Sequence, residues 1–109
     1  MKEDAEGYVG MPCCHGFGSF MYEDKKLRFI VIDKLGSDLE KHFKSGEKPF
    51  PLVTVLRVGL EVLDSLEFLH SKSYVHNDIK AQNLLVGALP ENADNIFLVD
   101  FGLACKYRY

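Results

Sequence analysis

A long run of apolar residues with a wide hydrophobic face is the feature that most constrains how this chain folds. The run extends from about Leu52 to His70, and its apolar positions are Leu52, Val55, Leu56, Leu60, Val62, Leu63, Leu66 and Leu69. This spacing predicts a helix, and the width of its apolar face predicts a helix largely buried in its parent domain. Because no stretch reaches the roughly 18 uninterrupted apolar residues of a membrane span, we expect no membrane partner.

Shorter segments around this helix predict an α+β fold. Short β-rich runs are found at residues 17–22, 27–33, 74–76, 84–86 and 96–100. The first two are separated only by the polar residues 23–26, which is typical of a hairpin. Ser37 with Glu40 three residues later forms a capping box, which predicts a short helix ending near Gly46. A chain of 109 residues makes one domain at most.

The charges exclude one class of partner. The 13 basic and 16 acidic residues give a net charge of −3 and are spread along the chain. Since nucleic-acid binding needs a basic stripe, we expect no direct contact with DNA or RNA. The first residues, Met1 to Asp4, lack the apolar segment of a signal peptide, so the expected location is the nucleus or cytoplasm.

The cysteines predict neither a disulfide framework nor a zinc site. Cys13, Cys14 and Cys105 are an odd number of thiols without CxxC spacing, and we expect them to be reduced. His15, next to the first two, raises the alternative of a metal cluster. A zinc site needs two further ligands at suitable spacing, and the sequence does not supply them.

One polar loop carries the chemistry. The residues HNDIKAQN at 76–83 place Asp78, Lys80 and Asn83 at offsets 0, +2 and +5, and Asp100 follows a β-rich run and precedes Phe101 and Gly102. Each residue alone has an ordinary explanation, such as a solvated loop aspartate or a surface lysine. In this order and after a long helix, the combined pattern HxDxKxxN and DFG resembles the catalytic loop and magnesium-binding motif of eukaryotic protein kinases.

The resemblance implies ATP-dependent transfer of a phosphoryl group to a protein hydroxyl, a reaction in which the protein mainly positions reactants and neutralises charge. It implies that Asp78 accepts or orients the proton of the substrate hydroxyl and that Lys80 places a positive charge beside the γ-phosphate. Asn83 and Asp100 supply oxygen ligands that suit Mg²⁺. A lysine two residues after the aspartate is typical of the serine/threonine class.

Further stretches resemble the vaccinia-related kinases, a branch of the casein kinase 1 group. They are FIVIDKLGSDL at 29–39, YVHNDIKAQNLL at 74–85, LVDFGLA at 98–104 and KYRY at 106–109. By this resemblance Ile32 is the gatekeeper, Asp33, Lys34 and Leu35 form the hinge that hydrogen-bonds adenine, and Leu85 lies beneath the base. Asn77 stands where many kinases have an arginine that pairs with a phosphorylated loop, which argues against that switch here.

The resemblance implies a partial kinase domain over 1–109: N-lobe strands at about 8–32, a hinge at 33–36, and the start of the C-lobe through DFG at 37–109. A kinase also needs a Gly-rich loop, a strand lysine and a helix glutamate before the hinge. None is found among the 32 residues before Asp33. We therefore expect the chain alone to be inactive. The alternative is a truncated, non-catalytic binding module with a kinase-like sequence.

Overall fold

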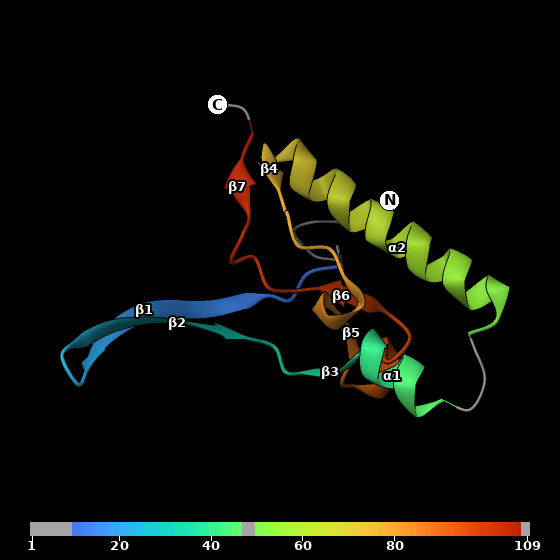
Figure 1. Ribbon diagram of the computed structural model, residues 1–109, viewed down its shortest axis with the longest axis horizontal. Coiled ribbons are helices and arrows are strands. Elements are labelled where there is room, and N and C mark those ends of the chain that lie inside the picture. The colour runs from blue at the N-terminus through green and yellow to red at the C-terminus, as the bar shows by residue number, and fades with distance from the viewer. Residues whose placement is uncertain (1–9, 47–49, 108–109) are drawn as a thin grey trace.

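The computed structural model describes residues 10–46 and 50–107; the predictions for the first residues lie outside these ranges. Its elements, in chain order, are β1 (Cys14–Tyr22), β2 (Lys25–Ile32), β3 (Leu35–Asp38), α1 (Leu39–Ser45), α2 (Leu52–Ser71), β4 (Tyr74–Val75), η1 (Ala81–Asn83), β5 (Leu84–Gly87), η2 (Pro90–Asn92), β6 (Ile96–Leu98) and β7 (Cys105–Lys106). The strands form the pairs β1–β2 and β4–β7 and a three-stranded sheet in the order β3–β5–β6 (Figure 1).

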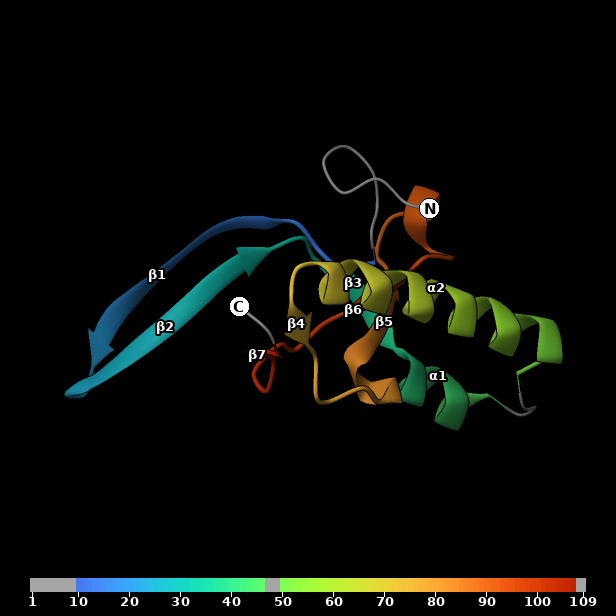
Figure 2. The same cartoon turned by 90° about the horizontal axis from the view of Figure 1, so that it is seen from above.

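The predicted hairpin is present. β1 and β2 pair antiparallel up to Tyr22 opposite Lys25, so Glu23 and Asp24 alone make the turn. Both have positive φ, 47° and 65°, as a turn that follows the twist of the two strands requires. The hairpin extends away from the other elements in both views (Figure 1 and Figure 2), and every residue of β2 is exposed.

The core lies between α2 and one face of the three-stranded sheet. Side chains alternate along β5 and β6, so Leu84 and Val86 point to the same face as Ile96 and Leu98. Leu39 from α1 completes this cluster, and Val58, Val62 and Leu66 of α2 pack against it. A buried carboxylate connects the two layers, because Glu61 Oε1 accepts the Ile96 N–H at 3.2 Å.

The capping prediction for α1 is wrong by one residue. The helix begins at Leu39, and Asp38, not Ser37, caps it by accepting the Lys41 N–H at 2.8 Å. An aspartate is as good a cap as a serine, and extended backbone at Asp38 puts its carboxylate next to the free N–H groups. The Ser37 hydroxyl instead contacts His42 Nε2 at 2.7 Å.

The long helix is confirmed as α2, but only part of its apolar face is covered within this chain. Leu69 is buried and Val58, Val62 and Leu66 contact the core. The exposed apolar side chains of α2 are Leu52, Val53, Val55, Leu56, Leu60 and Leu63. No helix among the described residues has the length and apolar character to span a bilayer.

This exposed face leads to a prediction for the isolated 109-residue chain. Apolar patches of this kind favour association, so we expect residues 1–109 expressed alone to self-associate or bind chaperones. Size-exclusion chromatography with light scattering measures the oligomeric state, and thermal unfolding measures cooperativity. Replacing Leu56, Leu60 and Leu63 by glutamine should reduce the association. A soluble monomer with one cooperative transition contradicts the prediction.

Three strands end earlier than expected: β2 by one residue, at Ile32 instead of Asp33, and β6 and β4 at left-handed turns. β6 stops at Leu98 instead of Asp100, because Asp100 has a φ of 61°, which no extended strand allows. β4 stops at Val75 instead of His76, since Asn77 has a φ of 71° and turns the chain. β4 therefore ends at the start of the polar loop, and β6 ends just before the DFG segment, each followed by a residue in the left-handed region.

Candidate functional site

The polar loop between β4 and β5 is fixed by His76, whose side chain is 1% exposed. Its Nδ1 accepts the Asp78 N–H at 3.1 Å, and its Nε2 lies 2.9 Å from the Val99 carbonyl oxygen. A ring with its proton on Nε2 satisfies both contacts, since a carbonyl can only accept. The ring also packs edge-on against Phe101, with centroids 4.9 Å apart. His76 thus joins the loop to the residues on both sides of Asp100.

Asp78 lies at the centre of a small polar network. Its Oδ2 accepts from Asn83 Nδ2 at 3.2 Å, and its Oδ1 lies 3.7 Å from Lys80 Nζ. Its side chain is 26% exposed, whereas that of Lys80 is 49% exposed. The network orients a carboxylate that solvent can reach.

Asn83 connects the loop to the strand that leads to Asp100. Asn83 is only 5% exposed. Its side-chain Nδ2 also donates to the backbone carbonyl oxygen of Asp78 at 2.9 Å, and its backbone carbonyl oxygen accepts the Val99 N–H at 3.0 Å. Asp100 follows in the left-handed region, where its Oδ1 accepts the Gly102 N–H at 3.2 Å. Aspartate enters this region more readily than most residues, and the hydrogen bond to Gly102 supports the turn.

Asn77 has a structural role that the sequence did not predict: its side-chain amide connects the loop to the segment after Gly102. Its φ of 71° suits an asparagine, which enters the left-handed region more readily than most residues. Its Nδ2 donates to the Leu103 carbonyl oxygen at 3.1 Å and to Cys105 Sγ at 3.3 Å. A neutral amide therefore holds the segment after Gly102 against the loop.

Three of the five residues expected to bind adenine line one cavity. Asp33, Lys34 and Leu35 line a cavity of about 440 Å³ together with Ala88, Leu89, Asn92 and Phe97. Leu85 lies next to Phe97, because the two residues are paired between β5 and β6 and point to the sheet face opposite the core. Ile32, the last residue of β2, is exposed and does not line this cavity.

A charged contact adjoins this cavity. His15 Nε2 lies 2.5 Å from Asp33 Oδ1. The hydrogen bond with His15 lowers the pKa of the Asp33 carboxyl; desolvation opposes this effect, whereas the charge of His15 and a hydrogen bond with the Cys13 backbone add to it. The three cysteines are free and exposed. Across residues 10–46 and 50–107, no three His, Cys, Asp or Glu side chains are grouped as metal ligands.

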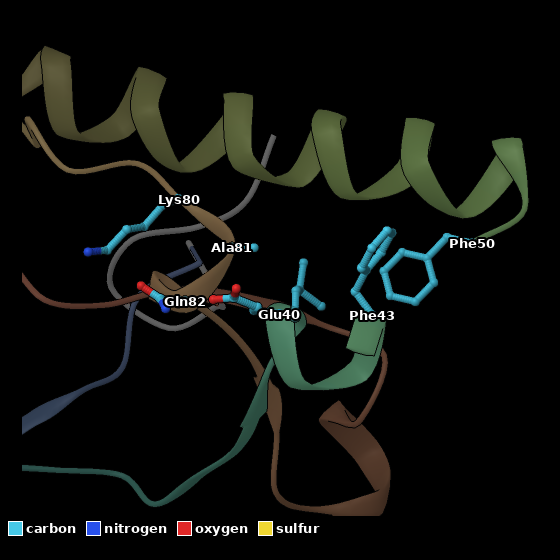
Figure 3. Close-up of a pocket in the computed structure, with 7 residues that line it drawn as sticks. Glu40, Phe43, Phe50, Lys80, Ala81 and Gln82 are labelled. Atoms are coloured by element: carbon cyan, nitrogen blue, oxygen red, sulfur yellow. The ribbon is translucent and has the colours of Figure 1, made fainter. Parts of the chain in front are cut away.

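A second cavity, of about 510 Å³, lies between α1 and the other side of the loop (Figure 3). It is lined by Leu39, Glu40, Phe43, Phe50, Lys80, Ala81 and Gln82. Phe43 and Phe50 meet edge to face with centroids 6.0 Å apart. The Lys80 amino group points away from these rings (Figure 3), toward Asp78. Of the four expected catalytic and metal residues, only Lys80 lines this cavity.

Comparisons with known proteins give consistent matches. The family model described as "Protein kinase domain" matches residues 17–109. "Probable serine/threonine-protein kinase FPV212" of fowlpox virus is 43% identical over 107 residues, and "Serine/threonine-protein kinase VRK2" of Homo sapiens is 43% identical over 101 residues. These alignments cover 98% and 92% of this chain but 34% and 19% of the relatives, so the chain spans about a third of their length or less.

The fold is also found among solved structures. A chain from "Structure of vaccinia related kinase 3" superposes with a TM-score of 0.77 at 36% sequence identity. The superposition covers 91% of this chain and 29% of that chain. The elements described above therefore occur in the same arrangement within a larger solved structure.

Proposed function

The chain belongs to the protein kinase family and is homologous to vaccinia-related kinases over most of its length, and on this premise we propose that it provides the phosphoryl-transfer site of an ATP-dependent serine/threonine protein kinase. The arrangement around Asp78 is the observation that supports this most. An amide donor from Asn83 and the cation of Lys80 both lie against an accessible carboxylate. Such an arrangement orients the carboxylate toward a substrate hydroxyl.

Phosphoryl transfer asks little covalent chemistry of the protein, so positioning carries most of the catalysis. In the proposed mechanism the hydroxyl oxygen of a protein substrate bonds to the γ-phosphorus of ATP while the bond to the β-phosphate oxygen breaks. Asp78 accepts the hydroxyl proton. Lys80, half-exposed beside it, places its positive charge next to the transferred group.

Asn83 and Asp100 fit the ligands of a magnesium ion. Mg²⁺ keeps several waters and needs only one or two carboxylates beside the phosphates, so a cluster of protein ligands is not required. The nitrogen of the Asn83 amide bonds to Asp78, and its oxygen is the end not used in that contact. Asp100 is exposed and supplies the carboxylate. Held by these two residues, Mg²⁺ would neutralise charge on the phosphates of ATP.

The adenine of ATP is assigned to Ile32, Asp33, Lys34, Leu35 and Leu85. The segment from Asp33 to Leu35 offers backbone hydrogen-bonding groups, and Ile32 and Leu85 offer apolar contacts. The cavity that Asp33, Lys34 and Leu35 line, with Phe97 next to Leu85, supports this assignment.

The class of acceptor is a direct test of this function. Because Lys80 stands two residues after Asp78, we expect phosphate on serine and threonine and none on tyrosine. The test uses the full-length protein, by which we mean this chain together with the flanking kinase segments that its relatives have. It is incubated with γ-labelled ATP, Mg²⁺ and peptides that carry serine, threonine or tyrosine, and the labelled amino acids are separated after hydrolysis. An Asp78→Asn sample gives the background. Label on tyrosine alone contradicts the class, and transfer no greater than background favours the non-catalytic binding module.

A further inference from the structure

His15 occupies an irregular position in β1. Cys14 pairs with Ile32 and Gly16 pairs with Val31, so two steps along β1 match one step along β2. His15 is therefore the extra residue of a β-bulge. Bulges turn a side chain out of the regular ladder and are frequent beside functional sites. Here the His15 ring is turned toward Asp33, the residue that directly follows β2.

That residue is Asp33, which begins a connection without strand pairing. β2 ends at Ile32 and β3 begins at Leu35. The contact of 2.5 Å between His15 Nε2 and Asp33 Oδ1 attaches the start of this connection to β1. Both side chains are about half-exposed, at 55% and 51%. The contact thus restrains the segment to which the adenine-binding role is assigned, without closing it to ligand.

The charges around the pair are few. The residues that face His15 across the ladder, Val31 and Ile32, carry no charge. The titratable groups next to the pair along the chain are the Cys13 thiol just before β1, the Cys14 thiol at the start of β1, and the Lys34 ammonium next to Asp33. Since the pKa of Asp33 is depressed in the folded protein, its stabilising contribution is complete above the ordinary pKa of aspartate and is lost as pH falls through the lowered value.

We propose that His15 is a positioning residue for adenine binding: by holding Asp33 it orders the segment Asp33–Leu35 and so raises nucleotide affinity. The inference rests on the proposed function, because it assigns a control of the same site. His15 does not take part in the transfer step, which belongs to the separate loop around Asp78. Its loss therefore acts on binding more than on turnover.

The test uses the full-length protein and two ligands. Adenosine has no phosphates, so its dissociation constant reports on the base-binding segment, and steady-state kinetics give KM for ATP and kcat. We expect His15→Ala to weaken adenosine binding and raise KM by about two- to five-fold, the range of exposed ion pairs, with a smaller change in kcat. His15→Gln should keep part of the affinity, because its amide retains a polar group at this position.

His42→Gln is the matched control, because that exposed histidine contacts a neutral hydroxyl and no carboxylate. Wild-type affinity in His15→Ala overturns the proposal, as does an equal loss in the control. If His15→Ala does not fold, a carboxyl NMR titration of His15→Gln decides: the Asp33 pKa should rise toward its ordinary value, and an unchanged midpoint overturns the proposal. A wild-type protein that binds neither adenosine nor ATP refutes the proposed function, while this titration still shows whether the pair exists.

Discussion

Replacing Asp78 by asparagine in the full-length protein should lower kcat by about 10²-fold or more, the size of effect expected from losing a positioned base. An asparagine side chain preserves the shape, and its one oxygen can accept from Asn83 or from Lys80, which lie 3.2 Å and 3.7 Å from the two carboxylate oxygens. It cannot accept the hydroxyl proton. ATP affinity should change little, since Asp78 is assigned to the acceptor and not to the nucleotide.

Steady-state phosphorylation and a separate nucleotide-binding measurement distinguish these two effects. Asp24→Asn is a matched control, because it makes the same chemical change in the β1–β2 turn, where the φ of 65° suits an asparagine. Full turnover in Asp78→Asn contradicts the role of Asp78. A large loss in Asp24→Asn means that turnover responds to changes remote from the site.

Replacing Asp100 by alanine should weaken Mg²⁺-dependent nucleotide binding by about 10- to 100-fold, a loss like that from altering the partners of a metal site. Activity should fall with it, because the carboxylate ligand to the bridging cation is removed. A Mg²⁺ titration of ATP binding measures the effect, and adenosine binding, which needs no metal, serves as the internal reference.

Alanine also tests the backbone, because Asp100 has a φ of 61° that alanine adopts poorly. Asp100→Asn separates the two causes, since asparagine tolerates this conformation but removes the negative charge. Loss of Mg²⁺ dependence in both variants supports the ligand role. An unchanged Mg²⁺ dependence in Asp100→Asn and Asp100→Ala contradicts it.

Periodic and local signals predicted much of the fold. The hairpin and the long helix follow from residue spacing, and both are confirmed. The cap of α1 was misplaced because Ser37 and Asp38 are adjacent and equally suited to the position; only the backbone angles at Asp38 decide between them. β6 was predicted too long, since the left-handed turn at Asp100 has no signature in a β-rich run.

The candidate site was predicted from its motif, but the contacts that support it were not. Offsets of Asp78, Lys80 and Asn83 are visible in the sequence, whereas the contacts of His76 with Val99 and Phe101 depend on how β4 and β6 come together. The pair of His15 and Asp33 depends on a bulge. A change of register by one residue is decided by pairing across two strands, and no single residue signals it.

The amide of Asn77 gives the segment after Gly102 a tether that ions in solution do not weaken. Its two hydrogen bonds, to the Leu103 carbonyl and the Cys105 thiol, involve no formal charge, so there is no Coulomb attraction for added salt to screen. An arginine that paired with a phosphate on the segment would lose that pair when a phosphatase removed the phosphate. With asparagine, the attachment of this segment depends neither on ionic strength nor on phosphatases. Oxidation of the exposed Cys105 thiol is then the chemical change that alters it.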